Sequence, residues 1–429
     1  MSPSDAPGNP TPSPLPAAER ARGRRLAIGS HPFGMTFMMV FTQPLPTLAL
    51  LTLGASETQV GVQMALVNVS LLLQLPTLRL VARISKRSIL VGAHALALTA
   101  ALPLLAFGSL AERAGGAGVG IALLCFAFVS AAIGASNTVW FPLLRAYVEP
   151  ERIGRFFGTL RTGWHLTLIV YFLGSQAWLA RHPGDFGPLF GVGWALGLVR
   201  IALISRLPER SERTGERIRI REAVALARQP AMRRYLIGVA WGRAVHAATI
   251  PFVVTLMRRE VGFDDSQVVL TTVAMFAGGL ASLYLWGRAV DRLGAAPVFF
   301  WSALGMGALV LALVAVRGAG PGTLLAMVGF FFAHSVLSAG FGVADTHVLF
   351  QLTPSHAPSR ALVLAAVCVG SLAGLAPALA GRLLDAALAG AIDRLDVYRV
   401  FFASMALLQA LAFWPLRSFR RGGAAPPAQ

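Results

Sequence analysis

The sequence predicts an all-α integral membrane protein of twelve transmembrane helices, arranged as two six-helix bundles related by pseudo-two-fold symmetry. Three observations predict this fold class. Apolar residues make up 55% of the 429 residues and charged residues only 13%, whereas a soluble domain carries about 25% charged residues. The apolar residues form continuous runs of about 20, the length of a helix that crosses a bilayer. Two polar turns half a chain apart repeat the same residues.

The apolar runs place the twelve spans in chain order. Continuously apolar runs favour helices over a barrel, because barrel strands alternate between apolar and polar residues. The spans are expected at 33–53, 58–80, 88–110, 118–147, 157–180, 185–206, 235–257, 266–286, 296–316, 321–350, 360–384 and 397–416.

The internal repeat is seen in the polar turns after the first and the seventh span. Each turn has Gly, an acid, Gln and Val at the same spacing, and the copies lie 208 residues apart. The matching residues are Gly54, Glu57, Gln59 and Val60 in the first copy and Gly262, Asp265, Gln267 and Val268 in the second. Parallel repeats of this kind occur in transporters, with the substrate site between the halves.

The repeat divides the chain into domains. We expect an N-terminal six-helix bundle over 31–206 and a C-terminal one over 234–417. The linker at 207–233 is rich in arginine and has apolar residues at helical spacing, which predicts an amphipathic helix on the membrane surface. Residues 1–30 are expected to form a disordered cytosolic tail, since they are rich in Pro, Ser and Ala, and 418–429 a second tail.

The positions of the basic residues predict the orientation. Most of the 37 Lys and Arg residues fall in the tails, the linker and the turns on the side of the N-terminus. The positive-inside rule then places both termini in the cytosol, and we expect a bacterial inner membrane. Basic loops that face an anionic leaflet account for the formal charge of +18, so that the lipid bilayer is the expected partner and no nucleic acid is needed.

One motif is typical of a known family. After the eighth span the sequence is Gly287-Arg-Ala-Val-Asp291-Arg292-Leu-Gly294, which resembles the Gly-x-x-x-Asp-Arg-x-Gly loop of the major facilitator superfamily. Gly287 is expected to allow a close approach to a neighbouring helix and Gly294 a tight turn. The resemblance implies a twelve-helix secondary transporter, in which Asp291 and Arg292 form a latch between two access states.

The N-terminal copy of the motif departs from this pattern. It has Ala82 in place of the acid and Ser85 in place of the second glycine. The latch is therefore expected to be weaker in the N-terminal half.

Two charged residues lie deep within predicted spans. Asp345 is the only acid placed away from tails, loops and helix ends, and Arg243 lies at a similar depth in the seventh span. Because an ionised group in a bilayer is costly without a partner or a cavity, we expect the two to face each other or to share a substrate. A structural ion pair, a substrate site and a protonation switch at Asp345 are the three alternatives.

Other candidate substrate-binding residues are polar or aromatic side chains within the spans. They are Gln43, Asn137, Trp140, Trp164, His165, Trp241 and His246. His246 is a second candidate for proton coupling, since histidine titrates near neutral pH. Packing within the bundle is the alternative for each histidine and tryptophan. No spacing of His, Cys or Asp suggests a metal site.

The predicted function is secondary transport of a small organic solute by alternating access, in the form of proton-coupled export of an amphipathic compound. The first alternative is uptake of a small anion or metabolite through Arg243. The second is an assembly factor or receptor with the same fold. The sequence has no Walker phosphate loop, nucleophile elbow or paired carboxylates, so we expect neither an enzyme nor a cofactor. We expect a monomer.

Overall fold

The computed structural model describes residues 15–81, 83–114, 117–149, 152–209, 220–353 and 358–419, and these ranges are helices joined by short turns. The N-terminal half contains α1 (Ala17–Val40), α2 (Leu45–Thr52), α3 (Glu57–Val69), η1 (Ser70–Leu73), α4 (Gln74–Val81), α5 (Lys86–Leu105), α6 (Phe107–Ala114), α7 (Ala117–Arg145), α8 (Ile153–Leu179) and α9 (Gly187–Ile204). The C-terminal half contains α10 (Ile220–Arg228), α11 (Pro230–Thr255), η3 (Leu256–Val261), α12 (Asp265–Leu293), α13 (Ala295–Ala312), η4 (Leu313–Ala315), α14 (Pro321–Leu352), α15 (Pro358–Ala389), α16 (Arg394–Leu411) and η5 (Trp414–Ser418).

The twelve expected spans are present. Ten helices or helix pairs of the described residues are long and apolar enough to cross a membrane, and α12 is an eleventh when its two segments, bent by 45°, count as one span. The remaining long helix, α8, is not among the most apolar ones, but its 27 residues are long enough to cross a bilayer. The fold is therefore the twelve-helix, two-bundle membrane fold that the composition predicted.

Two boundaries differ from the prediction. The first helix begins at Ala17, so residues 17–30 are helical and their assignment to a disordered tail is wrong. Ala, Arg and Glu, which dominate its first two turns, are strong helix formers, and they outweigh the polar composition that suggested disorder. The linker also ends early, because Pro230 already starts α11. Its expected amphipathic helix is α10, and 1–14, 210–219 and 420–429 lie outside the described residues.

The repeated turns have the same structure in both halves. Gly54 and Gly262 both adopt a left-handed backbone, with φ of +84° and +85°. After each glycine the next helix begins with a capping box, formed by Ser56 and Gln59 before α3 and by Asp264 with Gln267 before α12. Glycine tolerates positive φ and the capping box satisfies the first free amide groups of a helix, which explains why these residue types recur.

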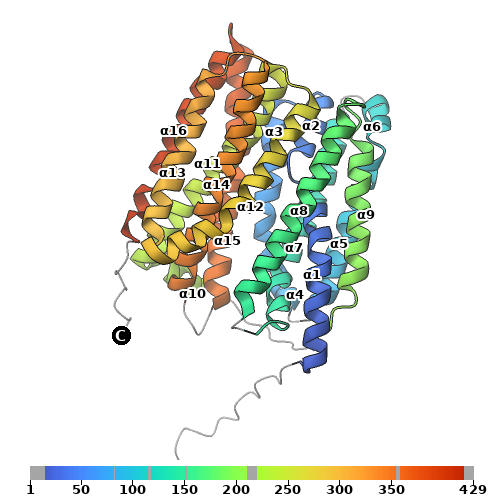
Figure 1. The fold of residues 1–429 in the computed structure, drawn as a ribbon, viewed down its shortest axis with the longest axis vertical. Coiled ribbons are helices and arrows are strands. Elements are labelled where there is room, and N and C mark those ends of the chain that lie inside the picture. Colours follow the sequence, from blue (N-terminus) through green and yellow to red (C-terminus); the bar gives the residue numbers. More distant parts are fainter. Residues whose placement is uncertain are drawn as a thin grey trace, which may run out of the picture.

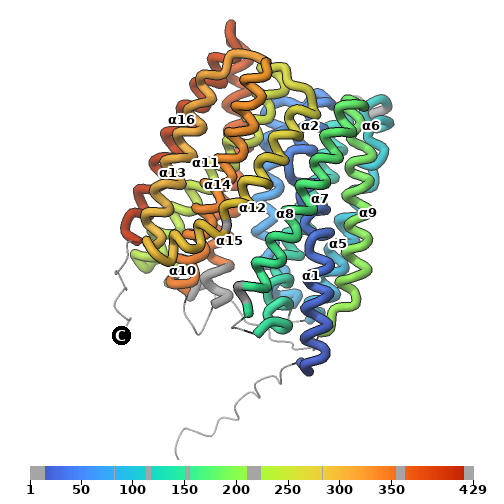
Figure 2. The backbone as a smooth tube through the Cα atoms, viewed as in Figure 1, coloured from blue at the N-terminus to red at the C-terminus, as the bar shows by residue number. Residues whose placement is uncertain are grey.

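The two halves lie side by side, with the blue-to-green helices of the N-terminal half next to the yellow-to-red helices of the C-terminal half (Figure 1). The backbone tube shows α8 and α12 adjacent at the boundary between them (Figure 2), and α3 and α15 form the second contact between the halves. We call the end of the bundle that carries α10 and the start of α1 the linker end, and the opposite end, which carries α2 and α6, the far end.

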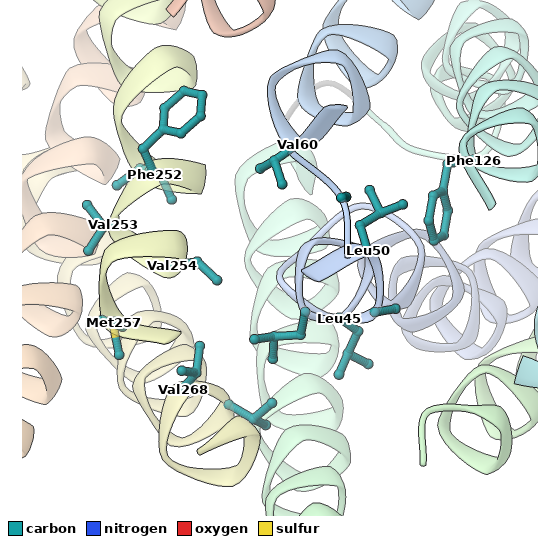
Figure 3. Packing of buried hydrophobic residues seen from close by; sticks show 14 of the residues in the cluster. Leu45, Leu50, Val60, Phe126, Phe252, Val253, Val254, Met257 and Val268 are labelled. Carbon is teal, nitrogen blue, oxygen red and sulfur yellow. The ribbon is translucent and has the colours of Figure 1, made fainter. Parts of the chain in front are cut away.

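The apolar cores differ between the two ends. One cluster of buried side chains includes residues of both halves, among them Leu45 and Leu50 of α2 and Val254 and Val268 of the C-terminal half. Figure 3 shows Val254 and Val268 on the sides of their helices that face Leu45. Toward the linker end the described side chains form separate clusters, each confined to one half. The halves therefore share a core at the far end and not at the linker end.

Candidate functional site

The two deep charged residues of the C-terminal half contact each other. Arg243 of α11 donates from Nη2 to Oδ2 of Asp345 on α14 over 3.1 Å. The hydroxyl of Tyr235, two turns earlier on α11, donates to Oδ1 of Asp345 over 2.6 Å. The expected contact between Arg243 and Asp345 is confirmed, and Tyr235 is a third member that the sequence did not single out.

This triad is within reach of a solute. The side chains of Arg243 and Asp345 are 35% and 18% exposed, although both lie on helices in the interior of the protein. Both oxygens of Asp345 accept a hydrogen bond, and bonds to an ionised carboxylate are among the stronger ones in proteins. Arg243 and Tyr235 on α11 are thus both held by one carboxylate on α14.

A histidine pair lies next to the triad. The ring of His246, one turn beyond Arg243 on α11, stacks on His334 of α14 with ring centres 5.1 Å apart. The Nδ1 atom of His246 is buried and has no hydrogen-bond partner among the described residues. His334 also stacks on Phe330. The two histidines lie on the same helices as the triad, on its far-end side.

Two candidate residues on α8 of the N-terminal half lie against α12 of the C-terminal half. Trp164 stacks on its neighbour His165 and meets Phe276 of α12 edge-on, with ring centres 6.2 Å apart. Nδ1 of His165 lies 2.7 Å from the carbonyl oxygen of Arg161. Trp164 and His165 therefore lie on the boundary between the halves, as a substrate site there would require.

The other tryptophans lie elsewhere. The indole N–H of Trp241 donates to the carbonyl of Leu408 on α16 over 2.9 Å, so it fixes α11 against α16. Trp140 is 6% exposed inside the N-terminal half, stacked on His31. The candidate tryptophans do not form one aromatic wall, because Trp164, Trp241 and Trp140 contact different helices.

The two polar amides are half-buried. Gln43 lies in the break between α1 and α2, next to Pro44. Asn137 lies on α7, one turn before Trp140. The described contacts do not bring either amide into the triad.

A buried cation of the N-terminal half was missed by the sequence analysis. Arg200 of α9 is 4% exposed, donates to the hydroxyl of Ser30 over 2.6 Å, and lies 4.0 Å from the ring centre of Trp140. Its Nε atom has no hydrogen-bond partner among the described residues. The signal was an arginine in the middle of an apolar run, the same kind of signal that identified Asp345.

A second missed group joins the two halves at the far end. Oε1 of Glu57, at the start of α3, accepts from Arg259 of η3 over 2.6 Å and from the hydroxyl of Tyr398 of α16 over 2.9 Å. Arg259 also donates to the carbonyl of Ala55. Asp385 of α15 accepts the backbone N–H groups of Glu57 and Thr58, over 2.9 and 2.8 Å.

We call Glu57, Arg259, Tyr398 and Asp385 the far-end cluster. In the sequence Glu57 precedes the other three by more than 200 residues, in a polar turn where an exposed position is the default expectation. Glu57 is instead fully buried. Because the Glu57–Arg259 contact joins the two halves, it forms only when the far end is closed.

The latch motif lies on the last two turns of α12 rather than in a loop. Gly294 has φ of +85° and links α12 directly to α13, which confirms the expected tight turn. The expected close approach at Gly287 is wrong, since a β-carbon there would meet no atom within 4 Å. Asp291 and Arg292 are exposed at the linker end.

The N-terminal copy of the motif does have a carboxylate nearby. The two oxygens of Glu209, in the linker, accept the backbone N–H groups of Lys86 and Arg87 at the start of α5, each over 2.8 Å. A carboxylate is favoured at a helix N-terminus, and Glu209 supplies one at the start of α5. Residue 82 itself lies outside the described residues. Next to Glu209, burial raises the pKa of the Tyr147 hydroxyl, which donates to the Pro208 carbonyl.

Groups of three or more His, Cys, Asp or Glu residues that could hold a metal ion do not occur within the described ranges.

This chain is similar to known proteins in structure and not in sequence. No protein-family model matches the sequence, and no curated protein matches it. Among solved structures, a mutant of the nucleoside transporter NupG superposes with a TM-score of 0.70 at 13% identity and covers 92% of this chain and 99% of its own. A second NupG structure has a TM-score of 0.66 at 12% identity, with 94% and 98% covered. A D-xylose-proton symporter has a TM-score of 0.68 at 14% identity, with 92% and 97% covered. At these identities the similarity shows the fold.

Proposed function

We propose that this chain, which has the fold of the major facilitator superfamily, is a secondary transporter that moves a small organic solute by alternating access. The observation that carries the proposal is the unequal contact between the halves. They share an apolar core and a buried ion pair at the far end, whereas their cores are separate at the linker end. In alternating access, each state has the two halves in contact at one end and separate at the other, and this arrangement fits one such state.

The linker end is proposed to face the cytosol. The arginine-rich linker and most basic residues belong to that end, and the positive-inside rule favours their placement there. The state described is then open to the cytosol and closed to the outside. For a bacterial inner membrane, both termini lie in the cytosol.

The proposed substrate site lies between α8 on one side and α11 and α14 on the other. Trp164 and His165 supply an aromatic and polar wall, and Tyr235, Arg243 and Asp345 supply donors and an acceptor. Arg243 already has a carboxylate partner, so uptake of a small anion through Arg243 has less support than transport of an uncharged solute. The structural neighbours are a nucleoside transporter and a D-xylose-proton symporter, so nucleosides and pentoses are the first solutes to test.

Asp345 is the proposed proton-coupling residue, with His246 as the second candidate. In this scheme a proton on Asp345 weakens its pairing with Arg243 and changes which donors a solute meets. Coupled transport then requires that solute binding and protonation favour the same rearrangement, since a ligand shifts an equilibrium only by its differential affinity for the two states.

The test is counterflow in proteoliposomes that contain the purified full-length chain, with labelled uridine, xylose and an amphipathic cation as candidate solutes. We expect saturable counterflow of one solute class, counterflow that no longer depends on pH in Asp345→Asn, and little change in Asp396→Asn. Asp396 is a matched control because it forms an exposed ion pair with Arg399 on the same helix. An imposed pH gradient of either sign then separates import from export.

If the protein is an assembly factor or a receptor, we expect no counterflow of any solute. A folded protein that moves no solute and keeps the far end closed under all conditions would contradict the transporter proposal. Alkylation of a cysteine placed inside the far-end core reports this directly.

A further inference from the structure

A separate pocket lies at the linker end of the C-terminal half, between the first turns of α11 and η5. Its volume is about 670 Å³. The lining residues are Arg234, Ile237, Trp414, Pro415, Arg417 and Ser418. None of them belongs to the triad or to the far-end cluster.

The pocket is cationic. Arg234 and Arg417 contribute two positive charges, and no carboxylate is among the described residues that line it. The guanidinium of Arg417 lies over the Trp414 ring, 3.7 Å from its centre, which holds the charge in a defined place. The hydroxyl of Ser418 adds a hydrogen-bond donor. Two guanidinium groups and a hydroxyl match the oxygen atoms of a phosphate ester.

The deeper side of the pocket is apolar and the side nearer the linker end is charged. Two chain segments show this order. On α11, which starts at the linker end, Ile237 lies one turn deeper than Arg234, about 4.5 Å along the helix axis. On η5, which runs toward the linker end, Trp414 precedes Arg417 by one turn. Ile237 and Trp414 are 50% and 63% exposed. Exposed tryptophan at the level where apolar surface gives way to arginine is typical of the membrane interface.

We propose that this pocket binds the phosphate-bearing headgroup of an anionic phospholipid from the leaflet at the linker end. The phosphate lies between Arg234 and Arg417, and the acyl chains extend along Ile237 and Trp414. Basic pockets between transmembrane helices on the cytoplasmic side recognise anionic headgroups in this way. A soluble phosphate could use the two arginines, but it would gain nothing from the exposed apolar rim.

The site is independent of the proposed transport cycle, since it uses no residue of the triad. It does lie on α11, the helix that carries Tyr235 and Arg243. A headgroup held at its first turn would fix that end of the helix against η5.

The experiment measures lipid binding to the full-length protein by native mass spectrometry, with phosphatidylglycerol and phosphatidylcholine as probes. We expect phosphatidylglycerol to bind preferentially, and its affinity to fall about fivefold in Arg234→Gln or Arg417→Gln and about 30-fold in the double variant. Arg233→Gln is the matched control, because Arg233 is an exposed arginine of the same turn that does not line the pocket. It should bind like the unmodified protein.

Two further arms separate the sources of the phosphate and exclude misfolding. Inorganic phosphate and glycerol 3-phosphate at millimolar concentration should not compete with phosphatidylglycerol. Competition at those concentrations would assign the pocket to a soluble anion and overturn the lipid proposal. Equal loss in Arg233→Gln, or no loss in the double variant with an unchanged melting temperature in phosphatidylcholine, would overturn it as well.

Discussion

The buried ion pair of the far-end cluster offers the sharpest test of alternating access. Glu57→Gln keeps the shape of the side chain and removes its charge. In the state described here Glu57 is fully buried and its Oε1 accepts from Arg259 and Tyr398. When the far end opens, Glu57 and Arg259 are expected to separate and to become hydrated. The pair therefore stabilises only the closed far end.

The magnitude follows from these two hydrogen bonds. A hydrogen bond to a charged group contributes about 1.5–3 kcal/mol, and the amide introduced by the substitution still accepts one neutral bond. Arg259 is 26% exposed and also donates to the Ala55 carbonyl, so the charge that remains is partly compensated. We expect a net loss of about 2 kcal/mol for the closed far end, which corresponds to about a 30-fold shift in the equilibrium between the two states.

The assay is the rate of alkylation of a single cysteine by a membrane-impermeant maleimide added from the far-end side. Val254→Cys is a suitable reporter because Val254 is buried in the core shared by both halves. It is introduced after Cys125 and Cys368, which are both free thiols, have been replaced by serine. If alkylation requires opening, its rate should rise about 30-fold in Glu57→Gln, in proportion to the shift in the equilibrium.

The control breaks an ion pair that lies within one half. Glu260 pairs with Arg394 over 2.9 Å, and both belong to the C-terminal half. Glu260→Gln should leave the alkylation rate within about twofold of the unmodified protein. Equal rates in Glu57→Gln and Glu260→Gln would refute the idea that the far-end cluster holds the halves together.

Three further predictions follow from the same contacts. Gly381→Leu should hold the far end open and abolish counterflow in proteoliposomes, because a β-carbon at Gly381 would collide with the carbonyl oxygen of Glu57 in the other half. The control is Gly174→Leu, which should show normal counterflow because a β-carbon at Gly174 would meet no atom within 4 Å. Asp345→Asn should abolish the pH dependence of counterflow, and an unchanged pH profile would exclude the protonation switch at this residue. Arg200→Met should leave the free energy of unfolding unchanged or raise it by up to a few kcal/mol, because an apolar side chain often replaces a buried charged group without loss of stability. A large drop in melting temperature would show that the contacts of Arg200 are themselves stabilising.

The sequence was sufficient for the features that depend on local composition and periodicity. The apolar runs determined the number of spans, because a helix that crosses a bilayer must satisfy its backbone hydrogen bonds internally. The recurrence of Gly54 at Gly262 predicted the repeat, since a left-handed turn favours glycine wherever it occurs. Arg243 and Asp345 were paired correctly because an ionised group in a membrane needs a partner.

The tertiary structure alone decided which residues meet across the two halves. Glu57 and Arg259 are 202 positions apart, and each follows an apolar run as an exposed loop residue would. Tyr235 joined the triad through its position two turns before Arg243, which no sequence pattern distinguishes from ordinary packing. Arg200 lies in the middle of an apolar run, so the rule that applies to Asp345 and Arg243 also predicts a buried charge with a partner at this position.

What the sequence determined, then, is a chain that must lie in a membrane as two similar bundles, because its apolar runs and its repeated turns are local properties. Which end of the bundles is closed is not a local property. It depends on whether Glu57 can reach Arg259 and whether Gly381 lets α15 approach α3, and both contacts join segments that only the folded arrangement brings together.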